Sequence, residues 1–399
     1  MTKSLQKSTM KSKVYKGLHE NSKSTDVYKK ETEMNNPYNP SFGMRPERFL
    51  GREMIINEIE SAFDNFNSPW RSTILTGVRG SGKTAILSDL QMRFRDQKAI
   101  VVLAAPIEGF LDDILGQIYR QLPKSLLSKL PKISKINTGL GASFEMGSDE
   151  NILPFTTTFR YQVTTLLEEC KAKEKPIVIL IDEVQKHFAE MRTFVSTYQQ
   201  LLMEDYKIIL VMAGLPNAIR DILNDDILTF FRRSKQVVLD VVDYSLVKHD
   251  YHETFMNNHH NICEDIVDEM TCATKGYPYL IQLIGYYMWE SLKTTEDARK
   301  AYEDSMVYIK SALFTNVHQL IYSELSKTDK NFILAMSEDE EVSKTSDISL
   351  RLEKDKGFTS RYRDRLLATG VIKAVGHGEL SFAIPYMREF LIKNQRNSY

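Results

Sequence analysis

The most informative segment of the sequence is Gly77-Val78-Arg79-Gly80-Ser81-Gly82-Lys83-Thr84. It matches the pattern GxxxxGK[ST] and lies between a β-branched run, 72–76, and a segment with apolar residues at helical spacing, 82–95. In a strand–loop–helix context this pattern binds phosphate, because backbone N–H groups and the helix N-terminus both face the ligand. The segment therefore predicts a phosphate-binding loop.

The residue types in this loop have distinct expected roles. Glycines let the backbone approach phosphates without a clash from Cβ. Lys83 is expected to reach the β- and γ-phosphates of ATP, and the Thr84 hydroxyl to coordinate Mg²⁺. The residues expected to bind the nucleotide are Gly77, Gly80, Ser81, Gly82, Lys83, Thr84 and Ala85.

Two acidic residues, Asp182 and Glu183, follow the apolar run 177–181. Ligands of open α/β sheets bind beyond the carboxyl ends of the strands, so these carboxylates are expected near the loop. We expect Asp182 to hold Mg²⁺, directly or through water, and Glu183 to orient and activate the attacking water. The pair predicts hydrolysis of ATP to ADP and phosphate.

The fold class follows from apolar runs that alternate with helical patterns. The expected strands are 72–76, 99–104, 177–181 and 208–212, and the expected helices are 51 to about 66, 82–95 and 110–122. Fully apolar strands separated by helices predict a parallel sheet covered on both faces, which is the α/β class.

Composition changes divide the chain into four parts. After residue 240 the pattern becomes helical, and after 326 three short helices precede a strand–turn–strand signal at Gly376-His377-Gly378, the winged-helix arrangement. The segment 123–153 does not fit the α/β alternation and is compatible with an inserted hairpin. The expected parts are a disordered polar tail (1–35), the α/β domain (36–240), a helical lid (241–325) and a winged-helix domain (326–399).

Composition also restricts the class of protein. The net charge of -1 excludes a chain that is basic overall, so any nucleic-acid surface must be local. The apolar runs are shorter than the roughly 18 residues that span a bilayer, and the N-terminus lacks the apolar region of a secretory signal. We therefore expect no membrane contact and a cytoplasmic location. Cys170, Cys263 and Cys272 lack metal-ligand spacing and are expected to be buried free thiols.

These motifs, spread over residues 37–390, resemble those of the AAA+ ATPases, and more narrowly the initiator-type clade with its origin-recognition proteins and the related STAND ATPases. The resemblance implies that 37–53 packs on adenine. Thr229-Phe230-Phe231-Arg232-Arg233 resembles the arginine-finger position, with Arg233 the better match and Arg232 the alternative. Such a finger reaches the γ-phosphate in a neighbouring subunit, so the resemblance implies a homo-oligomer with ATP at its interfaces. Two solvated arginines at a helix C-terminus are the simpler interpretation.

The lid sequence resembles the family with two departures. Gly276-Tyr277-Pro278 resembles the GxP motif of STAND ATPases, which implies that Pro278 lies near adenine; otherwise it is an ordinary proline at a helix start. Tyr279 stands where initiator ATPases usually carry the sensor-2 arginine. The strand beginning at 208 ends without the polar sensor-1 residue, for which Asn217 is the nearest candidate. These departures fit a slow nucleotide switch at least as well as a processive motor.

The expected recognition helix of the winged helix is basic. Arg361 and Arg365, four residues apart, are expected to share an outer face, and Arg363 projects elsewhere. With Lys373 and the wing, these cations predict phosphate contacts to duplex DNA. The alternative is that the winged helix packs back on the nucleotide domain, as in STAND ATPases.

Three functions remain open from the sequence. The first is an initiator-type ATPase whose nucleotide state controls assembly on DNA. The second is a STAND-like regulatory switch, in signalling or anti-phage defence, that acts through a separately encoded protein partner. The third is a regulator of transposition, which only the basic tail and the general fold favour.

Overall fold

A computed structural model describes residues 35–41, 43–65, 67–123, 137–138, 142–143, 158–171, 176–184, 189–224, 229–260 and 262–396. The tail expected at 1–35 lies, except for its last residue, outside the described residues.

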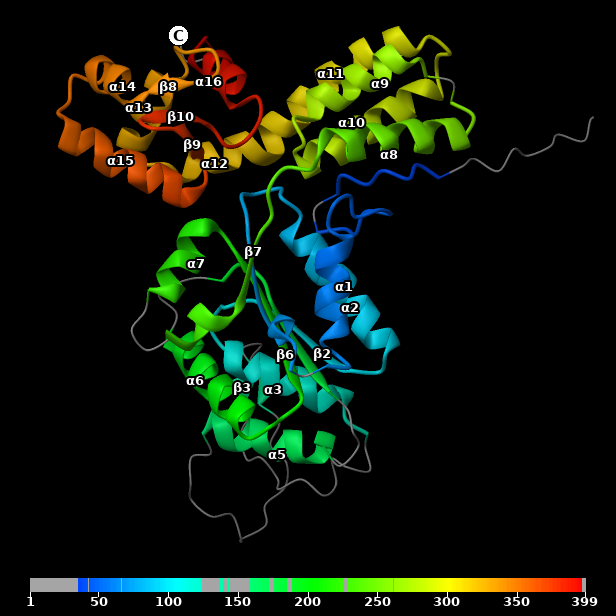
Figure 1. The fold of residues 1–399 in the computed structure, drawn as a ribbon, viewed down its shortest axis with the longest axis vertical. Coiled ribbons are helices and arrows are strands. Elements are labelled where there is room, and N and C mark those ends of the chain that lie inside the picture. Colours follow the sequence, from blue (N-terminus) through cyan, green and yellow to red (C-terminus); the bar gives the residue numbers. More distant parts are fainter. Residues whose placement is uncertain are drawn as a thin grey trace, which may run out of the picture. The chain divides into compact units, whose positions relative to one another are not determined.

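A five-stranded parallel sheet forms the centre of the N-terminal domain (Figure 1). The strand order is β2-β5-β6-β1-β7, and each neighbouring pair is parallel. The β1 strand lies between β6 and β7, so the loop that follows β1 leaves the sheet next to the carboxyl ends of both neighbours. The strands are β1 (Ser72–Thr76), β2 (Ile100–Ala104), β5 (Ile177–Ile181), β6 (Ile208–Gly214) and β7 (Lys235–Val238).

Helices cover both faces of this sheet because its strands are apolar on both sides. In β5, Ile177, Ile179 and Ile181 join one core cluster, whereas Val178 and Leu180 join the other. Helices α1 (Glu53–Ser61) and α2 (Lys83–Asp96) pack on the second cluster. The opposite face is covered by α3 (Phe110–Gln121), α5 (Phe159–Lys171), α6 (Ala189–Met203) and α7 (Pro216–Leu223). The fold is therefore the α/β class expected from the sequence.

Some boundaries differ from the expected ones. Helix α1 ends at Ser61 rather than near residue 66, because the chain turns back through a short 3₁₀ segment, η1 (Pro69–Arg71), to enter β1. Strand β2 begins one residue later than expected, at Ile100. Within the 123–153 segment, the described part contains an antiparallel pair, β3 (Asn137–Thr138) with β4 (Ala142–Ser143).

The helical region after β7 shares one core cluster with the C-terminal region, which contributes Phe332 and Leu366. Tyr251, Phe255, Ile284 and Trp289 are buried in one cluster. A run of helix continues from α11 through a π-helical turn into α12 and ends at Glu324. The elements are α8 (Tyr244–Asn257), α9 (Glu264–Thr274), α10 (Pro278–Leu292), α11 (Ala298–Leu313), η3 (Phe314–His318) and α12 (Gln319–Glu324).

The C-terminal region contains three helices, a small antiparallel sheet of order β8-β10-β9, and a last helix. This arrangement is compatible with a winged-helix domain. Helix α13 begins at Lys327, where Ser326 and Asp329 form a capping box. The elements are α13 (Lys327–Met336), β8 (Ser343–Lys344), α14 (Thr345–Arg351), α15 (Lys356–Thr369), β9 (Ile372–Gly376), β10 (Glu379–Phe382) and α16 (Met387–Arg396).

The expectation of buried cysteines was wrong for two of the three. Cys263 and Cys272 are free and exposed. Both belong to the region of α9, whose buried face is supplied by Ile266, Val267 and Met270, so these thiols lie on the solvent side of the helix.

Candidate active site

The phosphate-binding loop joins β1 to α2. Gly80 and Gly82 have φ angles of 72° and 92°, in the left-handed region that favours glycine. A Cβ at Gly77 would lie 2.5 Å from the Ser81 Oγ atom. Ser81 is buried, and its hydroxyl oxygen has no hydrogen-bond partner within the described part of the chain. The loop thus carries an unpaired buried hydroxyl and the open N-terminus of α2, both suited to a phosphate.

Lys83 folds back onto the loop. Its Nζ donates hydrogen bonds to the carbonyl oxygens of Gly77 (2.7 Å) and Val78 (2.9 Å). Burial lowers the pKa of Lys83 to about 8, although the nearby Asp182 opposes the shift. An anionic group in the loop would supply the countercharge that these neutral carbonyls lack.

The two residues expected to hold Mg²⁺ lie in contact. The Thr84 Oγ1 hydroxyl donates a hydrogen bond of 2.7 Å to Asp182 Oδ2. Asp182 follows β5, and its N–H donates to the carbonyl of Ala104 on the neighbouring strand β2. Hydroxyl and carboxylate oxygens are ligands that Mg²⁺ prefers, so this pair fits the ion.

Glu183 occupies a constrained backbone position beside Asp182. Its φ angle is 52°, unusual for a residue with a side chain, and its N–H donates to Asp182 Oδ1 at 2.9 Å. The next residue, Val184, returns to the sheet edge by donating its N–H to the carbonyl of Ala213. This turn leaves the Glu183 carboxylate exposed at the carboxyl ends of the strands.

Asn217, at the start of α7, has a buried amide oxygen without a partner in the described residues.

The segment before α1 connects α2 to the helical region. Gly43 lies beside Thr84, and its carbonyl accepts a hydrogen bond from Ser88 on α2. Arg45 pairs with the buried Asp89 of the same helix at 2.7 Å. At the other end, Tyr38 packs in the core of the helical region. The chain therefore reaches α1 along the first turns of α2, next to the loop.

Tyr277, which the sequence analysis did not assign to the site, contacts the loop directly. Its hydroxyl donates a hydrogen bond of 2.6 Å to the carbonyl of Arg79. A Cβ at Gly80 would lie 2.1 Å from that hydroxyl and 3.2 Å from the Cβ of Tyr279. Pro278, the residue expected near the nucleotide, is the first residue of α10. Tyr277 and Tyr279, on either side of Pro278, contact the phosphate-binding loop instead. Their position in and beside the Gly276-Tyr277-Pro278 motif was the only sequence signal for this contact.

The two candidate finger arginines differ in their surroundings. They end the 3₁₀ turn η2 (Thr229–Arg233), which the fully buried Phe231 anchors. The Arg232 Nε donates to the carbonyl of Leu223 at the end of α7 (2.7 Å). Arg233 is exposed and makes no hydrogen bond or ion pair to any residue that the structure describes. Both side chains are exposed, and within the described residues only Arg232 is held by a hydrogen bond.

Arg361 and Arg365 of α15 are both exposed, but the basic residues of this helix differ in their partners. Arg365 pairs at 2.9 Å with Asp329, a side chain only 1% exposed, because α15 packs on α13. Arg363 pairs with its neighbour Asp364 at 2.8 Å. Arg361, on α15, and Lys373, on β9, are exposed.

The C-terminal end of α15 touches the phosphate-binding loop. A Cβ at Gly370 would lie 3.0 Å from Val78 Cγ1 and 3.8 Å from Pro216 at the start of α7. The C-terminal region thus packs on the N-terminal domain, as in the alternative raised for the winged helix.

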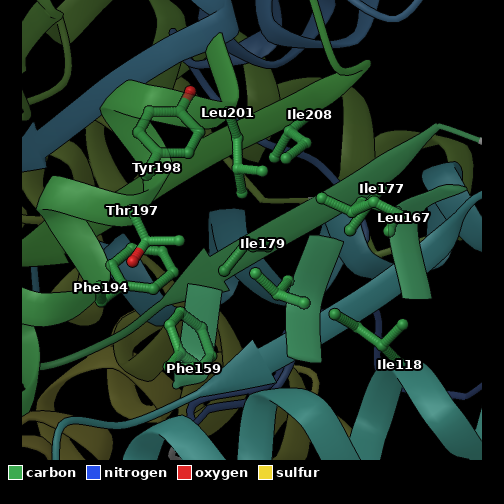
Figure 2. A pocket seen from close by; sticks show the side chains of 11 residues that line it. Ile118, Phe159, Leu167, Ile177, Ile179, Phe194, Thr197, Tyr198, Leu201 and Ile208 are labelled. Carbon is green, nitrogen blue, oxygen red and sulfur yellow. The ribbon is translucent and has the colours of Figure 1, made fainter. Parts of the chain in front are cut away.

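An internal pocket lies elsewhere in the N-terminal domain. It is lined by mostly apolar side chains from strands β5 and β6 and from helices α3, α5 and α6 (Figure 2). Ile177 and Ile208 line it, and both are the first residues of their strands, at the end of the sheet away from Asp182. We interpret it as a packing void of the core.

The described ranges contain neither a cluster of metal-ligating side chains nor a helix that could span a membrane. These residues contain no group of three or more His, Cys, Asp or Glu side chains that could hold a metal ion. Among the same residues, no helix is long and apolar enough to cross a membrane.

Comparisons with known proteins agree with this geometry. Residues 48–211 match the family model described as AAA ATPase domain, and residues 315–391 match a domain of unknown function, DUF8462. None of the curated proteins compared with the chain matches it.

Three solved structures are reported for their similarity to the chain, and the first of them shares its fold. A Walker-type ATPase, Paby2304, of Pyrococcus abyssi is 14% identical, with 88% of this chain and 97% of that chain covered at a TM-score of 0.61. Cdc6p from Pyrobaculum aerophilum is 14% identical, with 90% and 97% covered at 0.44. The Aeropyrum pernix ORC1 protein, solved in complex with DNA, is 14% identical, with 88% and 95% covered at 0.41. The family match and the first of these structures confirm the resemblance to AAA+ ATPases expected from the sequence.

Proposed function

We propose that this chain, which carries an AAA ATPase domain at residues 48–211, binds ATP with Mg²⁺ and hydrolyses it to ADP and phosphate. The observation that carries the proposal is the contact of Thr84 with Asp182, beside a lysine whose hydrogen bonds within the described residues go to backbone carbonyls. The motif and the strand-end acids come from distant parts of the sequence, and packing brings them to one edge of the sheet.

Each side chain has a chemical role in this proposal. Lys83 would move from the carbonyls of Gly77 and Val78 to the phosphates, where its charge is better satisfied. Thr84 and Asp182 would hold Mg²⁺, which when bound neutralises charge on the phosphate oxygens. Glu183 would accept a proton from the attacking water, since its carboxylate is exposed at the edge to which the loop belongs.

A neighbouring copy of the chain would complete the site. Arg233 is exposed and without a partner in the described residues, whereas Arg232 is engaged with Leu223. An arginine supplied in trans stabilises the charge that develops on the transferred phosphoryl group. We therefore infer an ATP-dependent homo-oligomer with Arg233 as the finger.

The nucleotide state would control the C-terminal region, which makes the chain a switch. Contacts of the loop with Tyr277 and Gly370 support this part of the proposal, because a phosphate-induced change in the loop must alter them. In this form of the proposal, a protein partner recognises the change in the C-terminal region.

Duplex DNA is the second candidate for the output. Its support is the exposure of Arg361 and Lys373 on the helix and strand expected to face DNA. The pairing of Arg363 and Arg365 with acids reduces the positive charge available there. Binding would be salt-dependent and not specific for sequence.

The test is steady-state ATP hydrolysis at low salt, with and without duplex DNA, with Glu183→Gln as the blank. Turnover that Glu183→Gln abolishes supports the ATPase. Stimulation by DNA that is lost in Arg361→Gln/Lys373→Gln favours DNA as the output. Turnover indifferent to DNA favours the protein-partner switch, and turnover unaffected by Glu183→Gln would refute the assignment of the base.

A further inference from the structure

Arg79 occupies a variable position of the phosphate-binding pattern, yet its side chain has a defined partner. Its Nη2 donates to both carboxylate oxygens of Glu324, at 2.7 and 2.9 Å. The two residues are 245 positions apart in the sequence. Glu324 ends α12, so this ion pair links the loop to the end of the long helical run that leads into the C-terminal region.

Glu324 stands at an unfavourable position in its own helix. The C-terminal end of a helix carries partial negative charge, and a carboxylate there is destabilising unless a cation compensates. The helical run from 298 to 324 is continuous, so its last residue faces this dipole. A residue that is unfavourable for its own helix is most often found at a functional position. The compensating cation here, Arg79, belongs to the phosphate-binding loop.

The backbone of the loop is held from the same side. Tyr277 donates to the carbonyl of Arg79, and Val78 lies against Gly370. Lys83 donates to the carbonyls of Gly77 and Val78. Residues 77–80 are therefore restrained by the lid and the C-terminal region in a conformation in which the lysine binds protein rather than phosphate.

We propose that Glu324 is a positioning residue that pairs with Arg79, withholds this guanidinium from the phosphates and thereby lowers the affinity of the loop for ATP relative to ADP. The inference rests on the proposed function, because it concerns the same site. Its physical basis is charge. An exposed cation on the loop acts on phosphates within the Debye length, about 8 Å at physiological salt, and a triphosphate carries more negative charge than a diphosphate. A paired arginine contributes less of this attraction.

The experiment is a calorimetric titration of Mg²⁺-ATP and Mg²⁺-ADP into Glu324→Gln, Arg79→Gln and the double variant. All carry Glu183→Gln so that ATP is not consumed. We expect Glu324→Gln to bind ATP about two- to fivefold more tightly, as the release of one exposed ion pair implies, with a smaller gain for ADP. The gain should shrink at high salt and be absent when Arg79 is already glutamine.

Glu269→Gln is the matched control. Glu269 pairs with Arg299 at 2.6 Å, and both side chains are about as exposed as the Arg79–Glu324 pair. It should leave the ratio of ATP to ADP affinity unchanged. An unchanged ratio in Glu324→Gln, or the same gain in the Arg79→Gln background, would overturn the inference while leaving the proposed function intact. Failure of the chain with Glu183 intact to bind either nucleotide would instead refute the proposed function.

Discussion

At the scale of single residues, the depressed pKa of Lys83 makes nucleotide binding sensitive to alkaline pH. The pKa of about 8 belongs to the nucleotide-free loop, where burial disfavours the ammonium. Phosphates favour the charged form, so the complex keeps the proton that the free protein loses as pH rises. We expect the affinity for ADP to be constant near pH 7 and to fall by about tenfold per pH unit above pH 8.

Titration calorimetry from neutral to alkaline pH measures this dependence. The calorimetric heats in buffers of different ionisation enthalpy should also report proton uptake on binding above pH 8 and none at pH 7. Lys83→Ala is the control, and it should lose tight binding at every pH because no other side chain hydrogen-bonds to these loop carbonyls in the described residues. An affinity that is flat through pH 9 would show that Lys83 retains its charge there.

Glu183→Gln separates binding from chemistry at the same site. The amide keeps the size of the side chain and cannot accept the proton of the attacking water. We expect nucleotide affinity within about twofold of the parent and a turnover lower by about 10²- to 10⁴-fold, the usual contribution of a general base. Single-turnover hydrolysis measured beside equilibrium binding checks both numbers. Loss of binding together with turnover would instead indicate that the φ of 52° at this residue has collapsed.

At the scale of elements, burial decides what could be read from the sequence. Strands β5 and β6 are buried along their whole length and appear as continuous apolar runs, so their positions were predictable. Strand β7 was missed because it lies at the edge of the sheet and only Val237 is buried. In the sequence, the apolar run Val237-Val238-Leu239 follows two polar residues, and a run this short does not distinguish a strand from a loop.

The candidate site also divides into a part that is local in the sequence, which could be predicted, and contacts between distant residues, which could not. Gly77 to Thr84 is a local motif, so its sequence alone indicates the phosphate loop. The contact between Tyr277 and Arg79 joins positions 198 residues apart and depends on how the helical region packs. The pairing of Arg365 with Asp329 was equally hidden, since helical spacing places a side chain on a face but does not identify its neighbour.

Gly285 tests how the segment before α1 is attached to the helical region. It lies in α10, and a Cβ there would come within 2.5 Å of the Tyr38 ring. We expect Gly285→Ala to cost about 1–3 kcal/mol in the free energy of unfolding, because the buried ring has no space to yield. The measurement is the midpoint of urea unfolding.

The matched control is Gly116→Ala, also within a helix, where a Cβ would meet nothing within 4 Å. It should stabilise the protein by about 0.5–1 kcal/mol, since alanine loses less backbone entropy on folding. Stabilisation in both variants would mean that Tyr38 is not held against α10.

At the scale of the whole molecule, side chains from three regions of the chain contact the phosphate-binding loop or the helix that follows it. Thr84 and Asp182 come from the N-terminal domain, Tyr277 from the helical region and Glu324 from the end of the long helix. In the proposed function, these contacts of one chain would bind the nucleotide and couple its binding to the C-terminal region. Lys83 is the cation that one chain is expected to bring to the phosphates, and the proposed function assigns a second cation, for the charge that develops during transfer, to Arg233 of a neighbouring copy.

Mixing two inactive variants tests whether a second copy provides that cation. Arg233→Ala keeps an intact phosphate loop, and Lys83→Ala keeps an intact Arg233. If the finger acts in trans, a mixed interface pairs the good loop of one chain with the good arginine of the other. Each variant alone should then be inactive, with Arg233→Ala slower than the parent by about 10³-fold or more, whereas the mixture should recover a substantial fraction of the parental turnover.

The recovery should rise with total protein concentration, because it depends on assembly, and should require ATP. Arg232→Ala serves as the comparison, since Arg232 is hydrogen-bonded to Leu223 and its loss should reduce stability more than turnover. A mixture no more active than its components would place the arginine in cis or outside the reaction. Complementation by Arg232→Ala with Lys83→Ala, and not by Arg233→Ala, would transfer the role to the neighbouring residue, which would have to leave the carbonyl at the end of α7 when the subunits meet.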